Sequence, residues 1–145
     1  MKKFVFSLER LMRLAQMREE VARAQLLTQE NIVRLAEVQV KTRSHSLSAM
    51  SFNASSKEEL QGTFALQLNG VEALEFSERE KSIALDQRDS AKDKWTVEKR
   101  SFESLSRLEE RDYRNYIEEL TRFEQMENDE VGSVMWYMRK REDEQ

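Results

Sequence analysis

The chain contains no proline in 145 residues. Proline removes a backbone N–H and clashes with the preceding turn, so it breaks a helix interior. Its absence leaves very long helices possible. Apolar residues recur at three- and four-residue spacing almost from end to end, although 36% of the residues are charged. An apolar stripe on a charged helix is typical of a coiled coil, and the sequence therefore predicts an all-α fold.

The composition limits the size of the core and the class of protein. Apolar residues make up 39% of the chain, and the mean hydropathy is −0.79. These values suit a narrow seam between two helices better than a thick globular core. High charge and low hydropathy also favour disorder, but disordered segments seldom keep apolar residues in phase over many turns. No apolar run approaches the roughly 18 residues of a membrane span, so direct membrane insertion is not expected. Glu9, Arg10 and Arg13 interrupt the apolar start, so no signal peptide is expected.

Charge is distributed unevenly along the chain. The net charge is −4, which argues against nucleic-acid binding. Residues 1–50 carry nine Lys or Arg and five Glu, a net charge of +4, whereas residues 51–145 carry a net charge of −8. Two segments of opposite sign are suited to pairing with each other.

The first periodic segment predicts a helix over about residues 7–45. Its expected seam has alternating spacings of three and four residues. The members of that seam are Leu14, Met17, Val21, Ala24, Thr28, Asn31, Leu35 and Val38. The serine-rich stretch 44–56 follows, and serine competes with the helix by bonding to its own backbone. The turn is therefore expected within 44–56.

A second helix is predicted over about residues 56–138. Ser56 and Glu59 form the S-x-x-E pattern of a capping box at its start. Gly62 and Gly70 are expected to let this helix fray or bend near its start. Its expected seam includes Leu60, Phe64, Gln67, Val71, Leu74, Glu78, Lys81, Leu85, Arg88, Lys92 and Trp95, and continues to Phe123. Residues 139–145 form a charged tail. The whole chain, 1–145, is predicted to be a single antiparallel coiled-coil hairpin with a C-terminal helix overhang.

A turn near residue 52 fixes which residues should face each other. Leu8 is then expected near Trp95, and residues beyond about 100 have no partner in the chain. An unpaired apolar stripe in that overhang predicts a binding or self-association surface.

Little in the sequence points to catalysis. The only histidine, His45, lies in the serine-rich stretch, and there is no cysteine. The usual nucleophile–base pairs therefore cannot be assembled, apart from those that use carboxylates or lysine. The three glycines make no phosphate-binding loop. We predict a protein that is not an enzyme and has no cofactor or metal. Arg10, Arg13 and Arg18 form a basic strip, which either pairs with the acidic second helix or contacts an acidic partner.

The opening Lys3-Phe4-Val5-Phe6, followed by Leu8-Glu9-Arg10-Leu11 running into a long charged helix, resembles the FliJ family. These are small coiled-coil proteins of the flagellar type III export apparatus. The size, the uneven two-helix layout and the charged tail are similar along the full chain, although most of this similarity is helical pattern. The segment Asn53-Ala54-Ser55-Ser56 and the apolar residues after it resemble the family's segment following the turn.

The resemblance implies a stalk that couples a hexameric export ATPase to the export gate in flagellum biogenesis, and through it in chemotaxis. In the family, an apolar set with i, i+4, i+7 spacing contacts the cytoplasmic domain of the export-gate membrane protein. Here that set is Phe64, Leu68 and Val71, with Glu75 next on the same face, where Glu75 departs from the expected residue types. The other interpretation is that Phe64 and Val71 pack on the first helix. Export chaperones are further expected partners.

The far end of the hairpin is expected to contact the ATPase ring. The expected contacts are Phe4, Leu8, Arg10, Leu11, Arg13, Tyr113, Tyr116, Leu120 and Phe123. The implied location is the cytoplasm, peripherally at the cytoplasmic face of the inner membrane, in the flagellar basal body. Three alternatives stay open: the equivalent stalk of a virulence type III secretion system, a coiled-coil chaperone, or a homodimeric scaffold.

Overall fold

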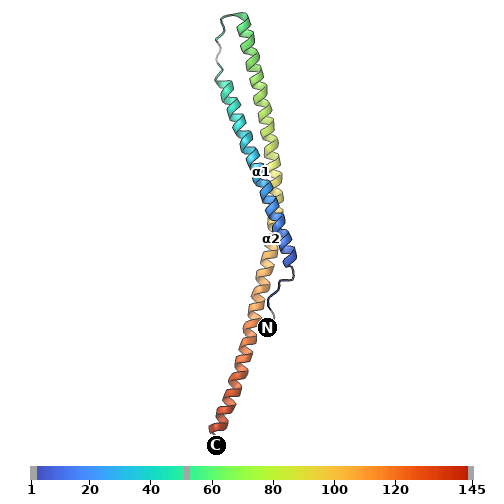
Figure 1. Ribbon diagram of the computed structural model, residues 1–145, viewed down its shortest axis with the longest axis vertical. Helices are drawn as coiled ribbons and strands as arrows, with labels where there is room; N and C mark the ends of the chain where they lie inside the picture. Colours follow the sequence, from blue (N-terminus) through green and yellow to red (C-terminus); the bar gives the residue numbers. More distant parts are fainter. Residues whose placement is uncertain (1–2, 51–52, 144–145) are drawn as a thin grey trace. The chain divides into compact units, whose positions relative to one another are not determined.

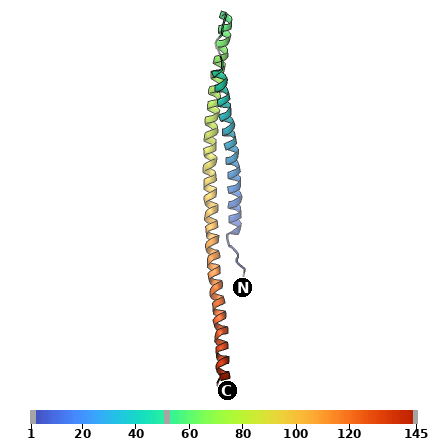
Figure 2. The same cartoon turned by 90° about the vertical axis from the view of Figure 1, so that its left-hand side faces the viewer.

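The computed structural model describes residues 3–50 and 53–143, and these residues form two helices and no strand. Helix α1 spans Glu9–Ser48 and helix α2 spans Lys57–Asp143. Glu19, in the first part of α1, contacts Trp95 of α2. Arg43, near the end of α1, contacts Ala73, which comes before Trp95 in α2. The helices are therefore antiparallel, and the predicted all-α helical hairpin is confirmed (Figures 1 and 2).

The internal contacts divide the chain into two compact units. The hairpin unit comprises residues 16–100, and the terminal unit comprises residues 1–15 together with 101–145. Both helices contribute to both units, because α1 passes through residue 15 and α2 passes through residue 100.

Side-chain hydrogen bonds explain where the helices end. The hydroxyl groups of Ser46 and Ser48 donate to the carbonyl oxygens of Thr42 (2.9 Å) and His45 (2.8 Å), so these serines bond within α1 and the helix continues to Ser48. At the start of α2, the Glu59 N–H donates to Ser56 Oγ (3.2 Å). The Glu59 carboxylate accepts from the Ser55 N–H (2.7 Å), one residue earlier than in a standard capping box. Ser51 and Phe52, at the predicted centre of the turn, and Glu144 and Gln145, at the end of the predicted tail, lie outside the described residues.

Small residues form part of the α2 side of the seam in the hairpin unit. They recur every seven residues, which keeps them on one face of a supercoiled helix. The four members of this small-residue row are Gly70, Ser77, Ala84 and Ala91. Ser77 is 1% exposed, and Ala84 is also buried. The α1 side supplies Ala22, Leu26 and Val33, which are buried as well. Because interaxial distance depends on the side chains at the contact, the small-residue row favours close packing of the two helices.

The predicted seam of α1 is wrong. Met17, Val21, Leu35 and Val38 are all exposed on the side of α1 that faces away from α2. Large apolar residues were assigned to the contact, but small residues fill much of it. On α2 the predicted positions Gln67, Leu74, Lys81, Arg88 and Trp95 are partly buried, as the seam requires. The other predicted seam positions of α2 lie one residue away from the side that faces α1. Leu60, Phe64 and Val71 are therefore exposed.

The predicted pairing offset is also wrong. A turn near residue 52 would place Glu19 opposite Leu85, whereas the Trp95 indole N–H donates to Glu19 Oε1 at 2.9 Å. The difference arises at the loop, because α2 begins beyond the end of α1 (Figure 1). Leu47 accordingly lies against Gly70.

In the terminal unit, residues beyond 100 do have partners in the chain, contrary to the expected overhang. The Phe4 ring contacts the rings of Tyr113 and Tyr116, with centroid distances of 5.2 and 5.6 Å. Phe6 is buried, and Tyr116 and Leu120 are partly buried. All residues of 121–142 are exposed, so the unpaired part of α2 begins after Leu120.

Gly62 and Gly70 both lie inside α2, which continues as a helix through them. A Cβ at Gly62 would meet nothing within 4 Å, whereas a Cβ at Gly70 would lie 3.0 Å from Leu47 Cδ1. We expect Gly62→Ala to raise the free energy of unfolding by up to about 1 kcal/mol through helix propensity. Gly70→Ala should gain less because Leu47 must move. Denaturant unfolding followed by circular dichroism tests this difference, and equal gains would contradict the close contact at Gly70.

Candidate partner-binding surfaces

The residues after the interhelical loop expose an apolar face of α2. Phe64, Leu68 and Val71 are 62%, 50% and 40% exposed. Thr63, Gln67 and Gly70 are the partly buried residues of this stretch, so they form the side of α2 that faces α1. The spacing i, i+4, i+7 places the three exposed residues on one side of the helix. The interpretation in which Phe64 and Val71 pack on the first helix is therefore wrong.

Glu75 continues this face one turn further on. Its Oε2 lies 3.6 Å from Arg79 Nη2, in an ion pair with both side chains largely exposed. Exposed pairs of this kind contribute little to stability. The Glu75 carboxylate can therefore exchange Arg79 for a cation of a partner at small cost.

The structure brings together only part of the set predicted to contact an ATPase ring. Three of its aromatic residues, Phe4, Tyr113 and Tyr116, form one cluster. Leu8 and Leu120 are partly buried, and Arg10 is exposed. Arg13 forms an ion pair with Glu9 along α1. Leu11 and Phe123 are exposed large apolar residues. The cluster thus has a structural role within the terminal unit, while Leu11 and Phe123 are available to a partner.

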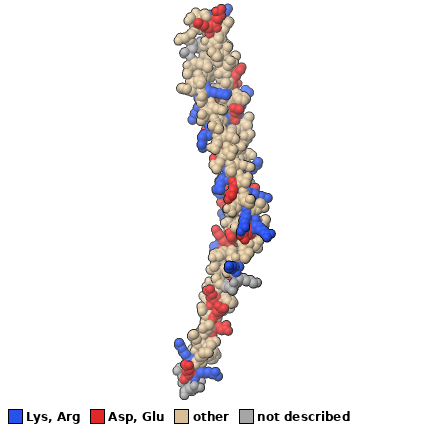
Figure 3. Space-filling view, in the orientation of Figure 1, with Lys and Arg blue, Asp and Glu red and all other residues tan. Residues whose placement is uncertain are grey.

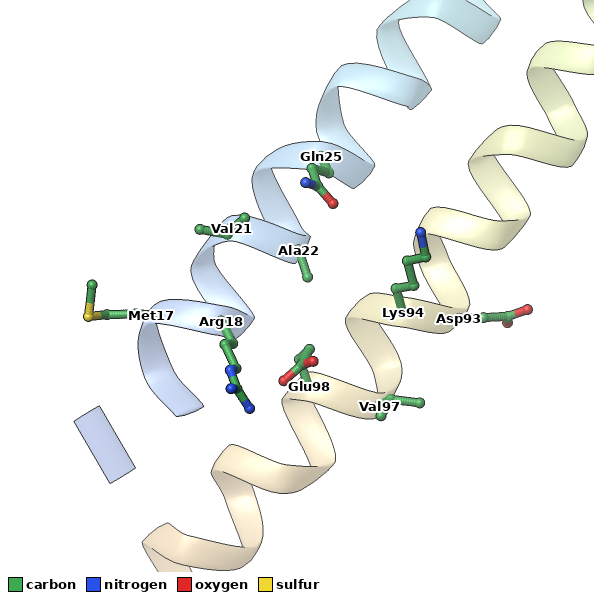
Figure 4. Close-up of a pocket in the computed structure, with 9 residues that line it drawn as sticks. All are labelled: Met17, Arg18, Val21, Ala22, Gln25, Asp93, Lys94, Val97 and Glu98. Atoms are coloured by element: carbon green, nitrogen blue, oxygen red, sulfur yellow. The ribbon is translucent and has the colours of Figure 1, made fainter. Parts of the chain in front are cut away.

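A groove along the hairpin unit was not predicted. Arg18, Ala22 and Gln25 of α1 face Lys94 and Glu98 of α2 across it. Met17 and Val21 lie on one rim, and Asp93 and Val97 lie on the other (Figure 4). A second groove of the same unit is lined by Ile32, Leu35 and Ile83, among others. Met17, Val21 and Leu35 were expected inside the seam, so the sequence pattern does not identify them as groove residues.

The last turns of α2 form a second unpredicted surface. The helix was expected to end near residue 138 but continues to Asp143. Val134, Met135, Trp136, Tyr137 and Met138 are all exposed. Lys140 Nζ lies 5.3 Å from the centre of the Trp136 ring, within the range of a cation–π contact.

Charged side chains are mixed in sign on the face shown in Figure 3, and neither sign gathers into a single patch. Within residues 3–50 and 53–143, no group of acidic, histidine or cysteine side chains could hold a metal ion. No helix in that part of the chain is long and apolar enough to cross a membrane. Comparison with protein-family models, with curated proteins and with solved structures finds no match.

Proposed function

We propose that the chain is a non-enzymatic stalk of a flagellar type III export apparatus, which couples a hexameric export ATPase to the export gate. The observation that carries the proposal is the exposed face of Phe64, Leu68 and Val71 directly after the interhelical loop. An apolar face on a helix that already packs through its other side suits the docking of a second protein. The resemblance of the opening and of this segment to the FliJ family indicates which protein that is.

Two surfaces are required of a coupling protein, and α2 carries both. Its first turns present the face proposed to bind the cytoplasmic domain of the export gate. Its residues in the terminal unit include the exposed Phe123, and together with the exposed Leu11 of α1 they supply the surface proposed to contact the ATPase ring. The proposed location is the cytoplasmic face of the inner membrane, where the export gate would be reached, with export chaperones as further partners.

The gate surface is tested with the double variant Phe64→Ala, Leu68→Ala. Truncating an anchor at a hot spot commonly costs about 2 kcal/mol or more, so we expect at least a tenfold loss of affinity for the gate's cytoplasmic domain. Helicity and thermal stability should stay close to those of the natural chain, because both side chains are exposed. Pull-down and titration calorimetry measure the two properties separately.

The matched control is the double variant Phe76→Ala, Leu66→Ala. It removes one phenylalanine and one leucine that are also exposed on α2 but lie on other sides of the helix. This control should bind the gate domain like the natural chain. Equal affinity of both double variants would remove Phe64 and Leu68 from the binding site.

A further inference from the structure

Helix α1 carries a second stripe, of four apolar and two uncharged polar residues, on the side away from α2. We call it the outer stripe, and its members are Met17, Val21, Ala24, Thr28, Asn31 and Leu35. Every one of them is exposed, and none is charged, in a chain whose residues are 36% charged. A helix in a two-helix hairpin needs only one apolar side. The outer stripe is therefore available for contact with another molecule.

We propose that the outer stripe binds the outer stripe of a second copy of this chain, with the two α1 helices antiparallel. This inference goes beyond the proposed export function and does not depend on it. All residues involved belong to the hairpin unit.

The order of residues along the outer stripe suits a twofold axis. An axis near residue 26 places Met17 opposite Leu35 of the partner copy, and Leu35 opposite Met17 of the partner copy. Ala24 faces Thr28 of the partner copy at the centre, where small side chains let the helices approach. Val21 faces Asn31 of the partner copy, so this pair, like Ala24 and Thr28, joins an apolar and a polar side chain. In such an isologous contact, every favourable pair occurs twice.

Charges beside the outer stripe match the same register. Glu20 and Arg34 flank the stripe, and both are exposed. The antiparallel register places Glu20 beside Arg34 of the partner copy, twice in the dimer. Leu27, also exposed, meets its own copy near the axis between these two ion pairs. A parallel arrangement would instead place Glu20 beside Gln25 and Arg34 beside Gln39. The charge pattern therefore selects a second copy in the antiparallel orientation.

The two grooves of the hairpin unit lie beside this contact. Met17 and Val21 line one groove, and Leu35 lines the other. Under the twofold axis, the Met17 end of one copy meets the Leu35 end of the other. The partner helix therefore contacts α1 residues at the rims of both grooves.

Sedimentation velocity of the full chain tests the proposal. The contact involves a single helix face, so we expect a monomer–dimer equilibrium with a dissociation constant of about 1–100 µM. Val21→Glu should weaken dimerisation at least tenfold, because it places a charge in the contact. The matched control is Val131→Glu on α2, because Val21 is 58% exposed and Val131 is 54% exposed. The control should dimerise like the natural chain. A monomer at all concentrations, or dissociation by Val131→Glu instead, would overturn the proposal.

Charge reversal tests the register itself. Glu20→Arg and Arg34→Glu should each weaken the dimer by about fivefold, because each places like charges together twice. The variant carrying both changes should regain the affinity of the natural chain, since the pairs are restored with opposite polarity. If the two charges instead acted only within their own helix, the effects of the two changes would add rather than cancel. A double variant weaker than either single variant would therefore rule out the antiparallel register.

Discussion

Replacing Ser77 by leucine is expected to lower the free energy of unfolding by about 2–3 kcal/mol. Ser77 is 1% exposed and lies in the small-residue row between α1 and α2. Its hydroxyl donates to the carbonyl oxygen of Ala73 (3.0 Å), which also accepts a hydrogen bond from Arg43 Nη1 of α1 (2.6 Å). A leucine side chain at this position has no space, and overpacking of a filled core commonly costs about 1–3 kcal/mol. The helices would have to separate locally, which also lengthens the Arg43 bond.

The same substitution at Ser82 is the control. Ser82 lies in the same helix but is exposed, so Ser82→Leu should change stability by no more than about 0.5 kcal/mol. Urea unfolding followed by circular dichroism at 222 nm measures both variants under one protocol. Equal stabilities of the two variants would show that small side chains at Ser77 and its row are not required for the seam.

The second large effect is expected at the far end of the chain. Removing residues 113–145 should abolish stimulation of the export ATPase, because it removes Phe123 from the proposed ring contact and Tyr113 and Tyr116 from the aromatic cluster of the terminal unit. Phe4 also loses its aromatic partners and can no longer be held in place. ATP hydrolysis by the hexamer, with and without the shortened chain, measures the effect.

Binding to the gate domain provides the control for this truncation. Phe64, Leu68 and Val71 lie in the hairpin unit, which comprises residues 16–100 and is left intact. The shortened chain should therefore bind the gate domain with the affinity of the full chain. A shortened chain that stimulates hydrolysis to the full level would show that residues 113–145 do not contact the ring.

The helices and the loop between them could be predicted because their signals are local. The absence of proline, the serine-rich stretch and the Ser56–Glu59 cap each act over a few residues. Helix α1 ends at Ser48 and helix α2 begins at Lys57, so both helix ends fall at the predicted turn region. The end of α1 was placed a few residues early, because Ser46 and Ser48 bond back to helix carbonyl groups instead of breaking the helix.

The register between the helices could not be predicted, because α1 has two apolar sides. The spacing of apolar residues predicts contact through the side with Met17, Val21 and Leu35, where the side chains are larger. The structure uses the side with Ala22, Leu26 and Val33, opposite the small-residue row of α2. The packing of the two helix surfaces against each other decides which side of α1 is buried. The spacing of apolar residues within one helix does not show how that surface packs on another. The exposed position of Phe64 follows from the same register, since Thr63 and Gln67 face α1 instead.

Titrating the full-length chain into the hexameric ATPase, while following ATP hydrolysis, measures whether the chain acts as the proposed stalk. We expect hydrolysis to rise and to saturate near one chain per hexamer, and the chain to sediment with the ring. If the rate of hydrolysis stays unchanged and the chain sediments separately at every ratio, the chain is not the stalk of this ATPase.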